Sequence, residues 1–143
     1  MQNKASVEVW LYNSKIASLL ILQVDNFDYT FWQPITGGIE NGETALAAAI
    51  REVNEETSIQ LAPEKLISLG HQEVLVEAEQ LLIQKEVFLG ITEETSVVIA
   101  AAEHQAYRWL PWQSAIEKQL YWPNNQASLQ LAKTYISSFL KNQ

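Results

Sequence analysis

The chain has 143 residues, of which 48% are hydrophobic and 18% charged. This length and composition are typical of one globular domain and exclude an intrinsically disordered chain. The absence of cysteine excludes disulfide scaffolds, iron–sulfur clusters and thiol nucleophiles. A net charge of −8, from 17 acids against 9 bases, disfavours partners such as nucleic-acid polymers and anionic membranes. A phosphorylated ligand would therefore need a divalent metal to screen its charge.

Targeting signals are not apparent in the sequence. Residues 1–15 lack an apolar stretch flanked by positive charge, so we expect no signal peptide. The longest apolar stretch, residues 16–22, is far shorter than the ~20 residues of a membrane helix. We therefore expect a soluble, cytoplasmic protein.

The first third of the chain is rich in strand patterns. Alternating apolar residues predict a strand over residues 7–11, and a turn at 12–15 leads to a second strand over 16–24. Residues 31–35 are aromatic and β-prone, but Pro34 keeps them out of a central strand.

Residues 44–57 have the periodicity of a helix, with Thr44 as a candidate cap. Its apolar stripe consists of Leu46, Ala49, Ile50 and Val53. Further strands are predicted over 66–76 and 85–91, with 77–80 as their connection, and 106–110 is an edge-strand candidate. The sequence of the apolar run 97–102 favours neither a helix nor a strand.

Two helices are predicted in the last part of the chain. One is short, over residues 112–119, and the other covers 126–140, which Asn124 or Asn125 can cap. The order of strands, helix, strands and helices indicates a mixed α/β sandwich with a mostly antiparallel or mixed sheet. No linker divides the chain, so we expect residues 1–143 to form one domain.

Three carboxylates lie close together on the helix predicted over 44–57. Glu52, Glu55 and Glu56 share one face beside the apolar stripe, because residues three and four apart are neighbours on a helix. Hard oxygen ligands without cysteine favour Mg²⁺ or Mn²⁺. A solvated acidic face is the alternative interpretation, because Glu-x-x-Glu-Glu is common by itself.

The surrounding residues favour the metal site. The chain fits the pattern G-x5-E-x7-R-E-U-x-E-E, where U is aliphatic, through Gly37, Glu43, Arg51, Glu52, Val53, Glu55 and Glu56. A chance match has a probability on the order of one in 10⁵. This pattern is the Nudix box, at about residues 37–59, and the chain resembles the Nudix hydrolases. One position departs from the family, because Ser58 stands where a helix-ending glycine is usual.

Segments outside the box extend the resemblance. Residues 31–40, 103–110 and 122–126 are similar to the branch of dihydroneopterin triphosphate diphosphatases and dNTP pyrophosphohydrolases. The resemblance implies a Nudix-type α/β/α sandwich with a mixed β-sheet. It also implies an Mg²⁺-dependent pyrophosphohydrolase in which water attacks a phosphorus atom of a small nucleoside or pterin triphosphate. A dinucleoside polyphosphate hydrolase and a non-catalytic nucleotide sensor are the alternatives.

The resemblance further implies the ligands of the metal. These are the carboxylates of Glu52, Glu56 and the distant Glu103, together with the backbone carbonyl of Gly37. Glu55 is a further ligand or acts through water.

Catalytic roles are implied for Glu55 and Arg51. Glu55 and Glu103 are both candidates for the general base. Arg51 would orient the carboxylates, with Glu43 as its bidentate partner. His104 is interpreted as a polar neighbour of the site rather than a catalytic histidine.

Substrate contacts are implied for Thr36, Trp32 and Tyr121. Trp32, Trp109 and Trp122 could stack on a base or pterin ring, or belong to the core. The loop before Phe31 lacks the basic residue that the branch uses to contact phosphate, and Lys4 is the nearest basic candidate.

Overall fold

The computed structural model describes residues 1–26, 28–100, 104 and 106–142. Its strands are β1 (Gln2–Asn13), β2 (Ser18–Asn26), β3 (Tyr29–Gln33), β4 (Ile35–Gly38), β5 (Leu66–Val76), β6 (Leu81–Thr92) and β7 (Ala106–Pro111). Its helices are α1 (Ala45–Thr57) and α2 (Pro123–Lys141), and short 3₁₀ turns are η1 (Pro63–Lys65), η2 (Glu77–Glu79) and η3 (Ile116–Gln119).

The strands form one mixed sheet. β1 and β6 run parallel in unbroken register, and the other strand pairs are antiparallel. The main order is β3-β2-β1-β6-β5, with β7 alongside β2. On its side away from β6, β1 pairs first with β4 through residues 6–9 and then with β2 through Tyr12 and Asn13. The long strand β1 therefore holds the two halves of the sheet together.

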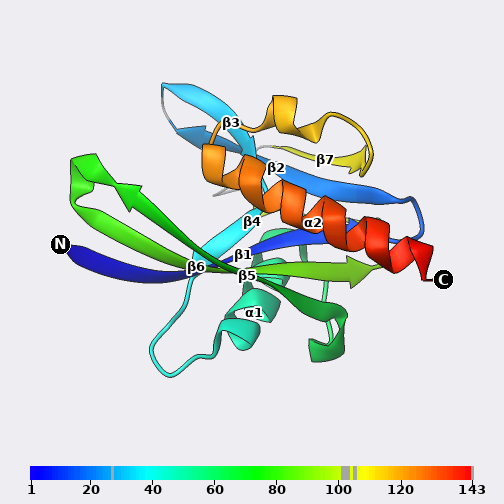
Figure 1. Ribbon diagram of the computed structural model, residues 1–143, viewed down its shortest axis with the longest axis horizontal. Helices are drawn as coiled ribbons and strands as arrows, with labels where there is room; N and C mark the ends of the chain where they lie inside the picture. Colours follow the sequence, from blue (N-terminus) through cyan, green and yellow to red (C-terminus); the bar gives the residue numbers. More distant parts are fainter. Residues whose placement is uncertain (27, 101–103, 105, 143) are drawn as a thin grey trace.

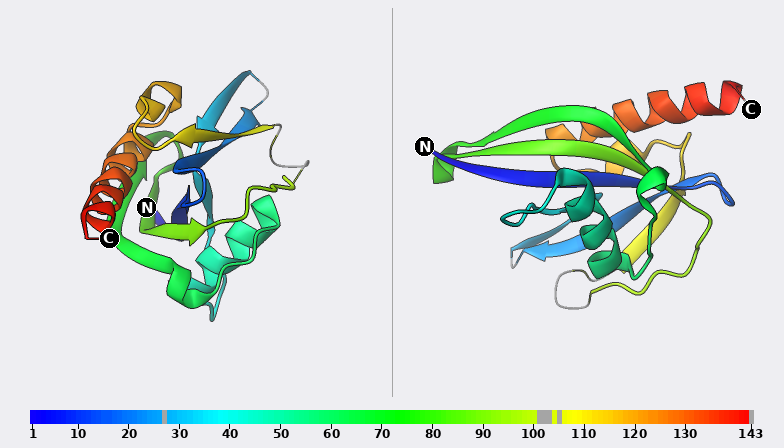
Figure 2. Two further views of the ribbon diagram at one scale, coloured as in Figure 1. Left: turned by 90° about the vertical axis from the view of Figure 1, so that its right-hand side faces the viewer. Right: turned by 90° about the horizontal axis from the view of Figure 1, so that it is seen from below.

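The two α-helices lie on opposite faces of this sheet (Figures 1 and 2). Alternate residues of β1 point to opposite faces, and both sets are buried. The α1-side cluster includes Val7, Val9, Leu11, Leu22, Ile35, Ala49 and Val53. The α2-side cluster includes Trp10, Tyr12, Ile21, Leu89, Leu129, Ala132 and Ile136. This arrangement confirms the predicted α/β/α sandwich with a mixed sheet.

Helix α1 has the ends that the sequence predicts. The Thr44 hydroxyl accepts a hydrogen bond from the Ala47 N–H at 3.1 Å, which caps the first turn. Ser58 follows the last turn in the left-handed conformation, with φ +66°, and its N–H donates to the Asn54 carbonyl at 2.8 Å. Ser58 thus occupies the backbone conformation that glycine adopts most easily.

Several predicted boundaries were wrong. The second strand begins at Ser18 rather than residue 16, because the Asn13 side chain accepts hydrogen bonds from the Lys15 and Ile16 N–H groups and holds the turn. The first strand and the strand predicted over 85–91 are longer than predicted, since their parallel pairing continues to both ends. Strand β3, which ends just before Pro34, lies at the edge of the sheet, as expected for residues 31–33, whereas the separate strand β4 after Pro34 was not predicted.

The helical predictions after residue 110 need two corrections. Residues 112–119 form only the turn η3, in which Ile116 is buried. Helix α2 begins at Pro123, earlier than predicted, because proline is favoured in a first turn where its missing N–H costs nothing. Asn124 and Asn125 therefore lie inside the helix and do not cap it.

Residues 97–100 have no regular secondary structure, and Val97 and Ile99 pack against the α1-side cluster. Residues 101 and 102 of the same predicted run lie outside the described residues. Neither α1 nor α2, nor any other described helix, has the length and apolarity to cross a membrane.

Candidate active site

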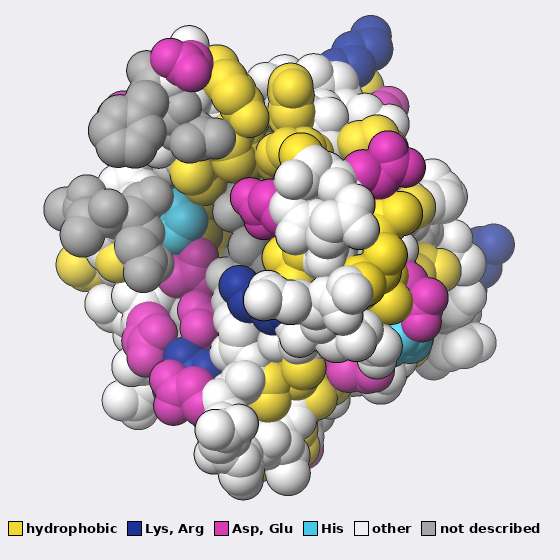
Figure 3. Space-filling model, turned by 90° about the vertical axis from the view of Figure 1, so that its left-hand side faces the viewer, with side chains coloured by type: hydrophobic (Ala, Val, Ile, Leu, Met, Phe, Trp, Pro, Cys, Tyr) yellow, Lys and Arg dark blue, Asp and Glu magenta, His cyan; other side chains and the backbone are white. Residues whose placement is uncertain are grey.

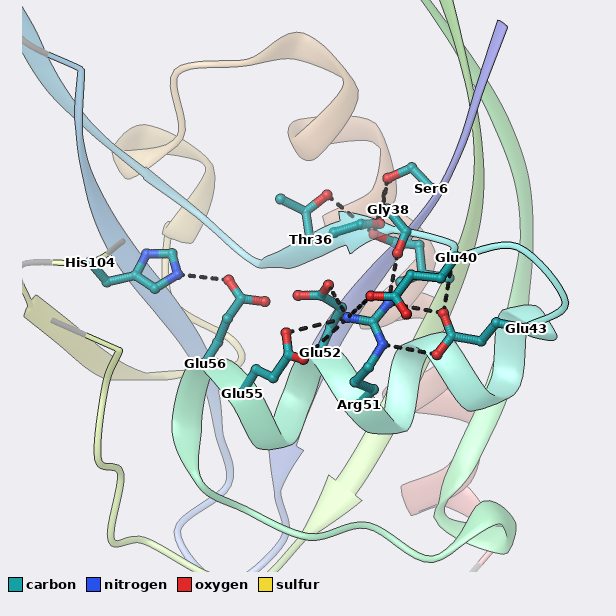
Figure 4. Close-up of polar contacts among 12 residues, drawn as sticks. Ser6, Thr36, Gly38, Glu40, Glu43, Arg51, Glu52, Glu55, Glu56 and His104 are labelled. Carbon is teal, nitrogen blue, oxygen red and sulfur yellow. Dashed lines mark hydrogen bonds and ion pairs between the residues drawn. The ribbon is translucent and has the colours of Figure 1, made fainter. Parts of the chain in front are cut away.

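Arg51 lies at the centre of a polar cluster on α1 (Figure 4). Its Nε and Nη2 donate to the two carboxylate oxygens of Glu43 at 2.8 and 2.9 Å. Its Nη2 also donates to the Gly38 carbonyl at 2.8 Å. The predicted bidentate pair is therefore present, and it ties the loop before α1 to the end of β4.

This pair remains ionised over a wide pH range. The hydrogen bonds from Arg51, assisted by the Glu40 N–H, lower the pKa of Glu43 to about 2. In turn, the hydrogen bonds to Glu43 and Glu52 raise the pKa of Arg51 above its ordinary value. Both members of the Arg51–Glu43 pair are therefore charged at neutral pH.

The three box carboxylates project from α1 toward β4, on the same side of the helix (Figure 4). The Glu52 and Glu56 side chains are 12% and 3% exposed, and Glu55 is 54% exposed. Arg51 Nη1 donates to Glu52 at 2.8 Å and to Glu55 at 3.3 Å. Figure 3 shows acidic side chains gathered around basic ones on this face. Arg51 thus offsets part of the repulsion among the acids.

Gly37 lies against the Glu52 carboxylate. A Cβ atom at Gly37 would overlap that carboxylate, so glycine is required for this close approach. The Gly37 carbonyl accepts a hydrogen bond from the Ser6 hydroxyl at 2.8 Å. A carbonyl oxygen has two lone pairs, so this bond leaves capacity for a second partner.

His104 lies outside the box in the sequence, but its buried side chain contacts a box residue in the structure. Its Nε2 lies 2.7 Å from Glu56 Oε1. The residues are 48 positions apart, and no local pattern in the sequence pairs them. Their contact agrees with the interpretation of His104 as a polar neighbour of the site. The preceding Glu103, predicted as a metal ligand, lies outside the described residues.

The donor atoms fit a hard divalent cation in type. Glu52 and Glu56 are buried carboxylates one helical turn apart, and Gly37 lies directly against Glu52. In the part of the chain that the structure describes, no three acidic or histidine side chains converge into a metal-binding group. Instead, Arg51 binds Glu52 and Glu55, and His104 binds Glu56.

A cavity of about 380 Å³ lies beside Gly37, mainly on the α2 side of the sheet. Its volume falls within the ~300–1,000 Å³ of typical ligand pockets. Its lining includes Thr36, Gly37, Lys85, Trp122, Asn124 and Asn125. Since Gly37 touches both this cavity and Glu52, the cavity adjoins the box carboxylates. A separate cavity of about 450 Å³, between Ser14 and Lys65, shares no lining residue with it.

The three predicted substrate residues lie in different surroundings. Thr36 lines the cavity, and its hydroxyl donates to the Val7 carbonyl at 3.1 Å. Trp32 packs against the α2-side cluster, with the Arg108 guanidinium 4.6 Å from its ring centre. Tyr121 is 55% exposed, and its ring meets that of Trp122 edge-on. Trp32 and Tyr121 are not among the described lining residues of the cavity.

Comparison with known proteins shows the family. Residues 2–131 match the NUDIX domain. The chain belongs to the NUDIX family. It is therefore a NUDIX pyrophosphohydrolase, an enzyme that hydrolyses phosphoanhydride bonds, as the box predicts.

Two curated relatives have different substrates in their names. The chain is 33% identical to the dihydroneopterin triphosphate diphosphatase of Escherichia coli K12 over 132 residues, which cover 85% of this chain and 87% of the relative. It is also 33% identical to the asymmetrical bis(5'-nucleosyl)-tetraphosphatase of Mus musculus over 106 residues, covering 73% of this chain and 71% of the relative.

Solved structures agree with the fold. The E. coli dihydroneopterin triphosphate pyrophosphohydrolase superimposes with a TM-score of 0.70 and 27% identity, covering 91% of this chain and 96% of that one. The C. elegans Ap4A hydrolase gives a TM-score of 0.67 at 22% identity, covering 96% and 99%.

Proposed function

We propose that this NUDIX hydrolase cleaves a small nucleoside or pterin triphosphate, either dihydroneopterin triphosphate or a dNTP, with Mg²⁺ as its cofactor and Mn²⁺ as a possible substitute. The observation that carries the proposal is the position of Gly37, which touches the Glu52 carboxylate and lines the adjoining cavity. A ring in that cavity would direct its phosphates around Gly37 toward the acids of α1. The E. coli relative supports the choice of substrate.

The metal would be held by Glu52, Glu56 and the Gly37 carbonyl, with Glu103 as the distant ligand. A divalent ion held there would supply charge neutralisation for the phosphates and would lower the pKa of a water molecule at the site. An acidic protein can then bind a polyanion as its metal complex. His104 would orient Glu56 through their 2.7 Å contact.

Glu55 is our candidate for the general base. It is the most exposed of the three box acids, so it can reach water while Glu52 and Glu56 stay buried. Glu55 would accept a proton as water attacks phosphorus, and Glu103 is the alternative base. Arg51 holds Glu52 and Glu55 in their orientations.

The substrate ring would occupy the cavity, where Thr36 and Trp122 are available as contacts. Trp32 and Tyr121 are proposed as further substrate contacts outside the described lining of the cavity. Tyr121 qualifies because its ring lies 4.7 Å from that of Trp122, which lines the cavity.

A substrate panel tests this function. Purified protein with Mg²⁺ is given dihydroneopterin triphosphate, the four dNTPs and diadenosine tetraphosphate, and pyrophosphate and orthophosphate are measured separately. We expect pyrophosphate from a pterin or nucleoside triphosphate, abolished by EDTA and restored by excess Mg²⁺. Zinc should substitute poorly. If neither pyrophosphate nor orthophosphate is released from any of these substrates, the proposal is contradicted and the nucleotide-sensor alternative is favoured.

The variant Glu56→Gln tests the site within that assay. It should fold normally yet lower kcat by about 10²–10³-fold, the typical effect of removing one preorganised electrostatic group. Glu40→Gln is the matched control, because Glu40 belongs to the same loop–helix unit and its side chain is 71% exposed. Turnover of Glu56→Gln within about tenfold of the parent would refute the assigned role.

A dinucleoside polyphosphate is the second candidate substrate. It is favoured by the mouse relative and by the exposed rings of Tyr121 and Trp122 beside the cavity, which could stack on a second base. The same panel distinguishes it, since hydrolysis of diadenosine tetraphosphate alone would assign this activity.

A further inference from the structure

A buried ion pair forms part of the cavity described above. Glu8 of β1 is completely buried, and the Lys85 side chain of β6 is 11% exposed. Lys85 Nζ donates to Glu8 Oε1 at 3.0 Å. The parallel register of β1 and β6 sets Ser6 opposite Lys85, so Glu8 lies two residues further along on the same face.

Other side chains satisfy the Glu8 carboxylate. Asn125 Nδ2 donates to Oε1 at 2.9 Å, and the Ser128 hydroxyl donates to Oε2. The Trp10 indole N–H in turn donates to the Ser128 hydroxyl at 2.8 Å. Both oxygens of Glu8 are therefore engaged inside the protein, and the carboxylate acts as an anchor for Lys85 and Asn125.

Lys85 retains hydrogen-bonding capacity toward the cavity. An ammonium group has three N–H donors and no acceptor. Among the described residues, its one hydrogen-bond acceptor is Glu8. Since Lys85 lines the cavity together with Thr36 and Asn124, its remaining donors are available to a ligand there.

The position of Lys85 suits the ring of a substrate better than its phosphates. Its charge is balanced by Glu8, so the pair adds little net attraction for a polyanion. It lies on the α2 side of the sheet, whereas the box acids proposed to bind the metal and phosphates project from α1. Lys85 therefore offers a directional donor rather than a general positive field.

We propose that Lys85, positioned by Glu8, is a specificity-determining residue that donates a hydrogen bond to a carbonyl group of the substrate ring. This inference rests on the proposed function. The hydrolase then prefers rings with a carbonyl, such as guanine or a pterin, over adenine. An amino group directed at Lys85 would face the N–H donors of the ammonium that point into the cavity, and neither set of donors would find an acceptor there.

Two purine nucleotides that differ in the group at C6 provide the kinetic test. For the parent, we expect kcat/KM to be at least about tenfold higher for dGTP than for dATP. In Lys85→Met this preference should fall at least about tenfold. Inorganic tripolyphosphate, which has no ring, is the third substrate and should report any effect on phosphate binding. An unchanged preference, or an equal loss with all three substrates, would overturn the proposal.

Control variants separate specificity from folding. Lys85→Met leaves Glu8 buried without its cation, so the double variant Glu8→Gln/Lys85→Met provides the same test in a neutral site. Lys133→Met removes another partly buried lysine, which donates to the Ser114 carbonyl at 2.7 Å and does not line the cavity. It should keep the parent's preference for dGTP.

Binding measurements keep this inference distinct from the proposed hydrolysis. GMP and AMP are titrated into the parent by calorimetry in the presence of EDTA, where neither metal nor turnover is needed. GMP should bind at least about tenfold more tightly than AMP. Equal affinities would overturn the role of Lys85 even if triphosphates are hydrolysed, whereas tighter GMP binding without hydrolysis would support Lys85 and refute only the proposed reaction.

Discussion

Glu52 has two close neighbours that restrict its carboxylate. The carboxylate lies so close to Gly37 that no Cβ atom would fit there, and Arg51 Nη1 donates a hydrogen bond to it at 2.8 Å. A carboxylate that is already fixed in this way loses little conformational entropy when it binds a metal ion. A small displacement of it would therefore lower the rate of catalysis.

Gly37→Ala should therefore impair catalysis more than folding. The new Cβ would displace the Glu52 carboxylate, and we expect kcat/KM to fall about 10²-fold while the circular dichroism spectrum is kept. Gly38→Ala is the control, because a Cβ there would meet Lys4 Cε at an ordinary 3.6 Å. Equal effects of the two variants would contradict this explanation.

Glu43 makes the stability of the fold depend on pH. Arg51 holds the pKa of Glu43 at about 2, below the ordinary 4.5. A carboxyl with a lowered pKa stabilises the folded state fully above its ordinary pKa, and this contribution disappears as the pH falls toward the lowered value. In Glu43→Gln, the loss of stability relative to the parent should be largest at pH 7 and shrink between about pH 5 and 2. Urea unfolding at several pH values measures this, and a constant difference would contradict it.

Helix α1 is the element that presents the acids, and its ends set its position relative to β4. Thr44 caps its first turn, and Ser58 ends it with φ +66°. A non-glycine residue in this conformation is strained, because its Cβ approaches the neighbouring carbonyl. The helix is therefore less stable at its C-terminus than a NUDIX helix with glycine.

Ser58→Gly should relieve this strain. We expect the free energy of unfolding to rise by about 0.5–1 kcal/mol in urea denaturation. Ser138→Gly, inside α2, should lower it by about as much, because glycine is unfavourable within a helix. If Ser58→Gly is also destabilising, the hydroxyl contact with the Val98 carbonyl at 3.3 Å outweighs the strain.

At the scale of the whole molecule, the network around Glu8 joins segments from both ends of the chain. Glu8 is 77 residues from Lys85 and 117 from Asn125, yet both donate to the same oxygen. These contacts connect β1, β6 and α2 across the α2 side of the sheet. Removing one partner of a buried pair leaves the other charged and desolvated.

Glu8→Ala should therefore cost about 3–5 kcal/mol of stability, measured by urea or thermal unfolding. Glu86→Ala is a matched control in the same strand as Lys85. Glu86 contacts His71 at a similar 2.8 Å, but its side chain is 41% exposed, so its removal should cost at most about 1 kcal/mol. Similar losses in the two variants would contradict the importance of burial.

Local patterns were sufficient for much of the site. Helical periodicity predicted α1 with Thr44 as a candidate cap, and the resemblance to the box implied the end of the helix at Ser58 and the pairing of Arg51 with Glu43. Pro34 correctly excluded the residues before it from a central strand, since β3 lies at the edge of the sheet. The prediction of a short helix over residues 112–119 was wrong. Only the 3₁₀ turn η3 forms there, and it buries a single apolar side chain, that of Ile116.

The sequence by itself determined the family, the fold class and the acidic face of α1, because helical periodicity and turn chemistry act over a few residues. Only the tertiary structure decided that His104 meets Glu56, and that Glu8, Lys85 and Asn125 gather beside the cavity. These contacts depend on the parallel register of β1 with β6 and on where α2 packs. Register and packing result from burial of the whole chain, so no short pattern encodes them.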